Sequence, residues 1–151
     1  MRIAIGCDEA AFELKEIIRQ RLIESGYNVD DFGTHENKPV LYPDIAFAVA
    51  KSIADGKHER GILLCGTGIG MAISANKVFG IRAAVCHDPF SAERARKSNN
   101  AQIMALGARI IGVELAKLLV DIWLNSEFEG GGSIEKIERI SEYEKRNFNN
   151  V

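Results

Sequence analysis

Long apolar runs, cysteine pairs and blocks of one charge are all missing from this chain of 151 residues. No stretch approaches the roughly 18 apolar residues that a membrane-spanning helix needs. The start, MRIAIGCDEA, has one basic residue followed by a short apolar run, without the long core and cleavage site of a signal peptide. With 19 basic and 21 acidic side chains, the net charge is −2, and no basic stripe indicates nucleic-acid binding. We therefore expect a cytoplasmic protein that binds neither membrane nor nucleic acid.

Cysteine is scarce, and its three positions exclude most cysteine-based frameworks. Cys7, Cys65 and Cys86 cannot all pair with one another, and none belongs to a CxxC motif. This argues against a disulfide framework and against a structural zinc site. Each cysteine is either a small core residue or a reactive thiol, and we expect Cys7 and Cys86 to be core residues.

Apolar segments with strand character alternate with segments of helical periodicity along the whole chain. The predicted strands are 2–7, 27–32, 61–65, 81–86 and 101–106, and the predicted helices are 10–25, 43–54, 69–78, 89–97, 113–124 and 133–147. This alternation predicts an α/β protein with a three-layer α/β/α Rossmann-like fold and a five-stranded parallel sheet. We expect a single domain over residues 1–151, with strand order 2-1-3-4-5.

Ligands of such folds bind at the carboxyl ends of the strands, where the strand order reverses. With the predicted order, the reversal lies between the first and third strands. Residues 7–9 (CDE) would then lie beside residues 65–68 (CGTG). The sequence therefore predicts a site built from these two segments.

The stretch CGTGIG, residues 65–70, follows the third predicted strand and opens a helix. Its glycines let the backbone approach a ligand closely, and the free amides at the helix start form a ready anion site. The positive end of a helix also lowers the pKa of a nearby thiol, so Cys65 is a candidate base or nucleophile.

Three interpretations of CGTGIG compete. The first is a nucleotide-binding loop, which Asp88, about 20 residues further on, supports. The stretch departs from the GxGxxG motif, however, because Met71 stands where the third glycine belongs and because the stretch does not follow the first strand. A glycine-rich turn around a buried cysteine would be purely structural. A thiolate base beside an oxyanion hole suits removal of a proton next to a carbonyl, because the resulting enediolate is negatively charged. We favour proton transfer.

Several longer segments resemble one known family. IAIGCD, YPD, GILLCGTGIGMAISANK, GIRAAVC, GARIIGVELAK and WLNSEFEGG are similar to the type B ribose-5-phosphate isomerases and the related galactose-6-phosphate isomerase subunits, over nearly the full chain. The resemblance implies an enzyme that converts ribose 5-phosphate to ribulose 5-phosphate, or a close relative of that pair, through an enediolate. It implies no metal and no organic cofactor. It also implies a place in the pentose phosphate pathway, and a homodimer or tetramer with shared active sites, with helix 133–147 packing on the partner.

The same resemblance assigns roles to individual residues. Cys65 falls on the catalytic base, Thr67 on a hydroxyl that assists ring opening or proton shuttling, and Asp8 on the acid that touches the sugar. The remaining substrate-binding positions are Gly66, Gly68 and Gly70 for the enediolate-binding amides, Tyr42 for the pocket tyrosine, Asn99 for a sugar-binding asparagine from the partner subunit, Arg109 for a partner-subunit arginine near the phosphate, and Lys136 for a phosphate-binding arginine.

The chain departs from the family pattern around the substrate. GCDEAA replaces the usual GCDHAG, so Glu9 stands in place of a histidine, and Ser98 replaces the histidine credited with opening the furanose ring. EGGGS replaces EGGRH, so a phosphate arginine is Gly132. Glu9 would repel a phosphate, and Lys136 offers a point charge where an arginine offers a fork.

These departures leave several hypotheses open. The substrate could be an open-chain four-carbon sugar phosphate or a hexose phosphate, or the chain could be one subunit of a mixed assembly. A hypothesis of another class is a non-catalytic sugar-phosphate binder, against which the retained Cys65 and Thr67 argue. His87 ends the fourth predicted strand, where it could replace a lost histidine or be a loop histidine facing water. We expect His35 and His58 at the surface and the basic side chains of helix 89–97 on a solvated face.

Overall fold

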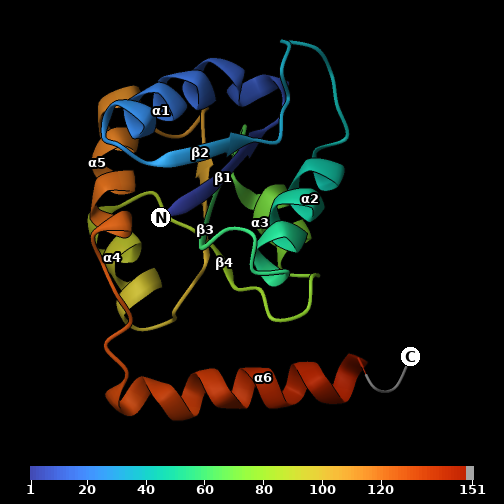
Figure 1. Ribbon diagram of the computed structural model, residues 1–151, viewed down its shortest axis with the longest axis vertical. Coiled ribbons are helices and arrows are strands. Elements are labelled where there is room, and N and C mark those ends of the chain that lie inside the picture. The colour runs from blue at the N-terminus through green and yellow to red at the C-terminus, as the bar shows by residue number, and fades with distance from the viewer. Residues whose placement is uncertain (149–151) are drawn as a thin grey trace.

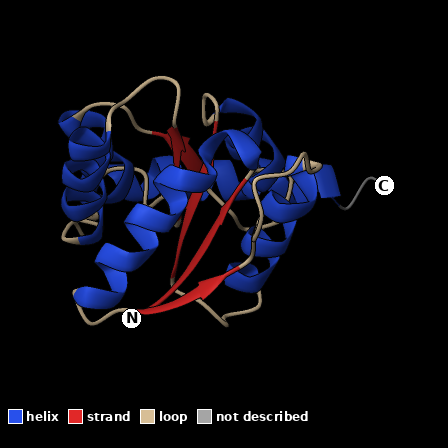
Figure 2. Cartoon of the chain, turned by 90° about the horizontal axis from the view of Figure 1, so that it is seen from above, coloured by secondary structure: helices blue, strands red, loops and turns tan. Residues whose placement is uncertain are grey.

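A computed structural model describes residues 1–148, and it shows a parallel sheet between two layers of helices (Figures 1 and 2). The strands are β1 (Arg2–Cys7), β2 (Asn28–Asp31), β3 (Arg60–Cys65), β4 (Ala83–Val85) and β5 (Ile103–Gly107). The helices are α1 (Phe12–Glu24, after a 3-10 turn at Glu9–Ala11), α2 (Tyr42–Ala54), α3 (Ile69–Ala75), α4 (Pro89–Lys97), α5 (Val113–Leu124) and, after a turn at Gly131–Ser133, α6 (Ile134–Phe148). The predicted three-layer α/β fold with five parallel strands is confirmed.

Side chains of the central strands point alternately into two separate cores, as the period of a strand requires. Ile62 and Leu64 of β3 face the core covered by α1, α4 and α5, in which Trp123 is fully buried. Leu63 and Cys65 face the core covered by α2 and α3. Cys65 therefore ends β3 on the α2–α3 side of the sheet.

The strand order is β2-β1-β3-β5-β4, so the predicted order 2-1-3-4-5 is wrong in its last two strands. Every residue of β5 (IMALG) is buried, whereas the three residues of β4 are only half-buried. A strand that is buried on both faces needs a neighbour on each side to satisfy its backbone hydrogen bonds. A short strand at the edge of a sheet leaves fewer unpaired backbone groups than a long one. β5 thus pairs with both β3 and β4, and β4 forms the edge.

β1 and β3 are direct neighbours, as predicted, and the sheet grows outward from them in opposite directions. Cys7 lies opposite Leu64, and the amide of Asp8 donates to the carbonyl of Leu64 at 3.2 Å. The switch point therefore brings the segment after β1 against the segment after β3, as the sequence predicts.

α6 runs along one end of the molecule, outside both helical layers (Figure 1). None of its residues, Ile134–Phe148, is buried. It touches the body through Glu144, which accepts a hydrogen bond from the amide of Gly80 at 2.9 Å, and through an edge-to-face contact between Phe148 and Phe79. Its packing on a partner subunit stays a prediction. Within residues 1–148, no helix has the length and apolarity to cross a bilayer.

Candidate active site

A cavity of about 430 Å³ opens at the carboxyl ends of β1 and β3. It is lined by Asp8, Tyr42, Cys65, Gly66, Thr67, Ile69, Gly70, Ile73 and Arg109. All of these except Ile69 and Ile73 are residues that the sequence singles out. The fold thus gathers the loops after β1, β3 and β5 and the start of α2 around one cavity.

The thiol of Cys65 lies inside the turn that opens α3. Its Sγ accepts a hydrogen bond from the amide of Gly68 at 3.0 Å, and the residue is 6% exposed. Gly68 has a φ of 79°, and a Cβ there would lie 3.1 Å from the backbone of Leu106. Glycine is therefore required, because the turn is left-handed and packs on β5. A hydrogen bond to a charged acceptor is stronger than one to a neutral acceptor, so this turn is suited to holding a thiolate.

The hydroxyl of Thr67 lies at the exposed side of the same turn. Its Oγ1 accepts from the amide of Ile69 at 3.3 Å. On its inner side, the Thr67 backbone packs on Gly107, where a Cβ would lie 2.8 Å from the Thr67 Cα. The turn is thus fixed by its contact with β5, while Thr67 lines the cavity.

Arg109 belongs to the cavity of its own chain, which corrects the expectation that this arginine comes from the partner subunit. The amide of Arg109 donates to the carbonyl of Gly66 at 3.0 Å, and the amide of Ala108 donates to the carbonyl of Cys65 at 2.8 Å. The Arg109 side chain lies over Gly66, with Cδ and Nη1 3.4 Å from where a Cβ would be. These bonds place one cation beside the candidate base.

Asp8 caps the turn that leads into α1. Its Oδ1 accepts from the amide of Ala10 at 3.0 Å. Burial raises the pKa of the Asp8 carboxyl, the negative charge of Glu9 raises it further, and Arg109 acts in the opposite direction. A carboxyl with a raised pKa keeps a proton closer to neutral pH, which suits proton exchange with a hydroxyl group.

Tyr42 lies directly over the first turn of α3. A Cβ on Gly70 would lie 2.6 Å from Cζ of Tyr42 and 2.8 Å from its hydroxyl oxygen. The phenol therefore occupies the space that the absence of a side chain at position 70 leaves open. This contact joins α2 to the same cavity.

Five predicted site residues lie outside this cavity lining, and one of them is Gly68, whose amide is bound to Sγ of Cys65. Glu9 accepts a hydrogen bond from the amide of Val40 at 3.3 Å. Nε2 of His87 accepts from the amide of Gly107 at 2.9 Å, and burial lowers the pKa of this histidine. Asn99 lines a different cavity of about 580 Å³, between the β4 edge and α6, and Lys136 is exposed on α6. Roles for Asn99 and Lys136 in a partner's site stay predictions.

None of the three histidines, all within the described residues, lines the cavity of the candidate base. His87 is bound to the end of β5, and His35 is exposed beside Asp31. The expectation that His58 lies at the surface is wrong, because it is 6% exposed and its Nε2 lies 2.7 Å from Oδ2 of Asp30. The solvated face expected for the basic residues of α4 is also wrong at Arg96, which is buried. Across residues 1–148, no group of three His, Cys, Asp or Glu side chains is placed to hold a metal ion.

Ile69 and Ile73, which the sequence did not single out, are 55% and 57% exposed at the cavity rim. Both stand on α3, whose opposite face is buried through Met71 and Ala75. Large apolar residues four positions apart on the outer face of a helix are a recognisable sign of a surface that another molecule covers.

Comparisons with known proteins agree with this geometry. Residues 3–140 match the family model described as Ribose/Galactose Isomerase. The chain is 60% identical to the D-erythrulose-4-phosphate isomerase of Pectobacterium atrosepticum, with 95% of each chain covered, and 54% identical to the ribose-5-P isomerase B of Listeria innocua, with 97% and 99% covered. Among solved structures, ribose-5-phosphate isomerase B of Clostridium thermocellum is 47% identical and has a TM-score of 0.96, over 97% of this chain and 99% of that one.

Proposed function

Because this chain belongs to the ribose/galactose isomerase family and is an aldose–ketose isomerase of sugar phosphates, we propose that its substrate is an open-chain four-carbon sugar phosphate. The proposed reaction interconverts D-erythrulose 4-phosphate and D-erythrose 4-phosphate. The observation that carries it is that no histidine of the described residues lines the cavity of Cys65. Nε2 of His87 is bound to the amide of Gly107 at the end of β5, while His35 lies beside Asp31 and His58 beside Asp30. Position 98 is a serine.

A missing ring-opening acid matters only for a cyclic substrate. A pentose 5-phosphate closes a furanose ring with its C4 hydroxyl, and the ring must open before isomerisation. In a tetrose 4-phosphate that hydroxyl carries the phosphate, so the sugar stays open. The relative at 60% identity, named for D-erythrulose 4-phosphate, supports the same assignment.

The proton transfer uses the groups around CGTGIG. The Cys65 thiolate takes a proton from C1 of the ketose, and the C1–C2 enediolate forms as the electrons move onto the C2 oxygen. The amides of Gly66, Thr67 and Gly70, at the start of α3, stabilise that oxygen. The other two amides of the turn are bound within it, that of Gly68 to Sγ of Cys65 and that of Ile69 to Oγ1 of Thr67. Cys65 returns the proton to C2, which gives the aldose, while Asp8 and Thr67 move the hydroxyl proton between O2 and O1.

The phosphate group of the substrate must be bound by basic side chains, and among the lining residues of the cavity Arg109 is the basic one. Arg109 lies over Gly66 in the cavity itself. Lys136 stands on α6, outside the two helical layers, so we assign it to the cavity of a second copy, together with Asn99. Because Lys136 is a point charge and Gly132 offers no side chain, the phosphate would be held less firmly than by paired arginines.

An apolar rim around the cavity supports a homodimer or a tetramer with shared active sites. This rim consists of Leu41, Ile69, Ile73 and Ile110, which are 55% to 74% exposed in the single chain. Exposed apolar side chains gathered around a polar cavity are typical of a surface that a partner covers. A second copy seated there would both bury the rim and close the cavity.

Ribose 5-phosphate remains the second candidate substrate, because relatives named ribose-5-phosphate isomerase B are 54% and 45% identical to this chain. Turnover of that sugar would place the chain in the pentose phosphate pathway. Asp8, with its raised pKa, is the group left to protonate a ring oxygen.

Side-by-side turnover of D-erythrulose 4-phosphate and D-ribose 5-phosphate by the purified chain tests the proposal, with Cys65→Ala as the control. We expect kcat/KM to be at least tenfold higher for the tetrose phosphate. Ser98→His should raise turnover of the pentose phosphate selectively. A clear preference for the pentose would overturn the assignment, and no turnover of either sugar would direct the search to hexose phosphates, a sister chain or a binding role.

A further inference from the structure

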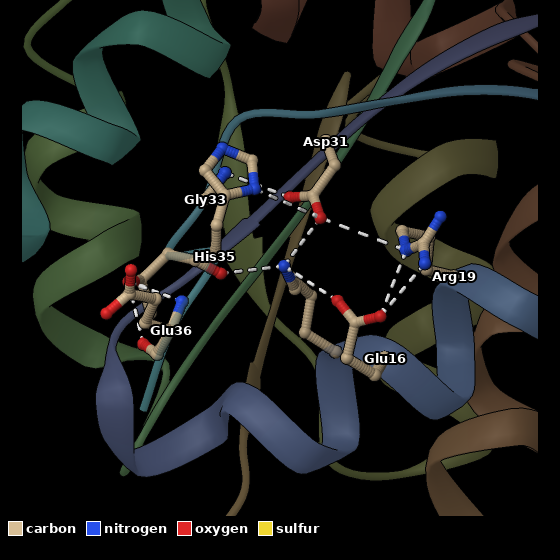
Figure 3. A network of polar contacts seen from close by, with 8 residues as sticks. Glu16, Arg19, Asp31, Gly33, His35 and Glu36 are labelled. Atoms are coloured by element: carbon tan, nitrogen blue, oxygen red, sulfur yellow. Dashed lines mark hydrogen bonds and ion pairs between the residues drawn. The ribbon is translucent and has the colours of Figure 1, made fainter. Parts of the chain in front are cut away.

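Lys15 is fully buried, although it carries a charge and does not reach the cavity. It takes an inward position on α1, between Leu14 and Ile18. Its Nζ lies 2.6 Å from Oδ2 of Asp31 and 2.9 Å from Oε1 of Glu16, and it donates to the carbonyl of Thr34 at 2.8 Å. Figure 3 shows this network, with Asp31 and Glu16 converging on one ammonium group.

The surroundings keep Lys15 charged. Burial alone would lower the pKa of its ammonium group, but the hydrogen bonds to Asp31 and Glu16 outweigh burial, so the pKa is raised. A buried charge is costly unless its hydrogen bonds are satisfied, and an apolar residue of similar volume often serves stability as well. The placement of Lys15 therefore calls for a reason other than core packing.

The Thr34 carbonyl that Lys15 holds belongs to a backbone ladder with the end of β1. The amide of Thr34 donates to the carbonyl of Cys7 at 2.7 Å, and the amide of Cys7 donates to the carbonyl of Gly33 at 2.6 Å. Oδ1 of Asp31 accepts from the amide of Gly33 at 2.9 Å. Asp31 and Lys15 thus fix residues 33–34, and these in turn fix Cys7, the residue directly before Asp8.

The same anchor holds one end of the segment that leads to Tyr42. Oγ1 of Thr34 donates to the carbonyl of Glu36 at 2.9 Å, and the other end of the segment is held by Glu9, which accepts from the amide of Val40. Residues 35–39 between these points are exposed. Asp8 and Tyr42 therefore reach the cavity on two segments that share one buried anchor.

We propose that Lys15 is a positioning residue for the isomerisation, which sets the placement of Asp8, and with it Tyr42, through Thr34 and Cys7. The proposal rests on the proposed function, because it assigns Asp8 a part in moving the hydroxyl proton. Lys15 itself touches neither the substrate nor the reacting atoms. Its effect should appear in kcat more than in KM, since it governs the geometry of proton transfer.

The experiment compares Lys15→Met with Arg19→Met in the full chain. Arg19 belongs to the rim of the same network, 2.9 Å from Glu16 and 3.8 Å from Asp31, but does not touch Thr34. At a temperature where circular dichroism shows both variants folded, we expect Lys15→Met to lower kcat at least tenfold and to change KM less than threefold. Arg19→Met should keep kcat within twofold. Equal kcat values for the two variants would overturn the proposal.

A double-variant cycle identifies the residue through which Lys15 acts. Asp8→Asn removes the proton-exchanging group while keeping the acceptor for Ala10. If Lys15 acts through Asp8, adding Lys15→Met to Asp8→Asn should cost less than threefold further in kcat, because effects of coupled residues are not additive. Full multiplication of the two losses would overturn the proposal, because Lys15 would then not act through Asp8.

Two further measurements keep the test decisive. If Lys15→Met does not fold, Asp31→Asn replaces it, since it keeps the Oδ1 acceptor for Gly33 and weakens only the ion pair, and the same kcat loss is expected.

If the wild-type chain turns over no sugar phosphate, the proposed function fails separately. Hydrogen exchange then decides the inference: faster exchange of residues 33–42 and of Asp8 in Lys15→Met than in Arg19→Met supports it, and equal exchange overturns it.

Discussion

The amide of Gly68 donates to Sγ of Cys65 at 3.0 Å, so the candidate base is held by the turn that follows it in the sequence. The turn can take this form only because Gly68 is left-handed and lies against the backbone of Leu106. The sulfur is thus fixed in direction before any substrate arrives. Preorganisation of this kind is what makes a buried thiol useful for proton transfer.

Cys65→Ser tests this role with the smallest change in shape. The serine hydroxyl can accept the bond from Gly68, but it is a much weaker acid than a thiol and supplies almost no anion at neutral pH. We expect turnover to fall by roughly 10²- to 10⁴-fold, the usual contribution of a general base. Measurement of ketose formation, together with deuterium incorporation at C1 in heavy water, checks both the rate and the proton transfer. Deuterium incorporation at the wild-type rate would count against Cys65 as the base.

Gly70→Ala tests the contact between α3 and Tyr42. The new methyl group would lie 2.6 Å from Cζ of Tyr42, so the phenol must move out of the cavity. We expect at least a tenfold loss of kcat/KM with the fold retained, because the phenol has room to swing away at the surface. Steady-state kinetics and circular dichroism measure the two effects.

Two comparisons make the Gly70 test specific. Gly112→Ala adds the same methyl group in open space at a negative φ, so it should leave activity unchanged. In a Tyr42→Ala background there is no ring to displace, and Gly70→Ala should then have little further effect. A loss from Gly70→Ala that is just as large without the tyrosine would show that the contact is not the cause.

Much of this arrangement follows from local sequence patterns. The alternation of strands and helices, the turn after β3 and the switch point are all set by periodicity and glycine placement, and residues 7–9 and 65–68 meet as predicted. The order of β4 and β5 does not follow, because both segments are short and apolar in the sequence. Only the relative burial in the folded sheet shows that β5 (Ile103–Gly107) needs two neighbours.

The position of Arg109 and the burial of Lys15 depend on tertiary contacts. Arg109 reaches the cavity through backbone bonds between the loop after β5 and the turn after β3, segments more than 40 residues apart in the sequence. The burial of Lys15 is indicated in part by the local sequence, because Lys15 falls within the spacing of the inward-facing residues Leu14, Ile18 and Leu22. A lysine within an apolar stripe is readily taken for a surface residue when its partner, Asp31, lies on another element.

Asp8→Asn should separate stability from activity. Folding raises the pKa of Asp8 above its ordinary value of 3.8, so the native state binds the proton more tightly than the unfolded state. The stabilising contribution is therefore present below pH 3.8 and is lost as the pH rises through the raised value. At pH 7 the charged carboxylate is unfavourable, and Asp8→Asn should raise the melting temperature by a few degrees while lowering turnover.

The pH dependence of melting supplies the control for Asp8. The gain from Asp8→Asn should shrink as the pH falls toward 3.8, where the wild-type carboxyl becomes neutral. Asp55 has the opposite shift, because a hydrogen bond from Lys51 lowers its pKa, so Asp55→Asn should slightly lower the melting temperature at pH 7. A lower melting temperature for Asp8→Asn at pH 7 would contradict the assignment.

Complementation between two inactive variants tests whether the active site is shared. Cys65 lines the cavity at the end of β3, whereas Asn99 lines the cavity near α6, so one chain does not bring them together. In a symmetric dimer of Cys65→Ala and Asn99→Ala chains, one site carries both changes and the other carries neither. Each variant alone should have little activity, and an equal mixture, unfolded and refolded together, should recover about one quarter of the wild-type activity. Activity that stays at the level of the separate variants would place both residues in the site of one chain, and α6 would then need a different role.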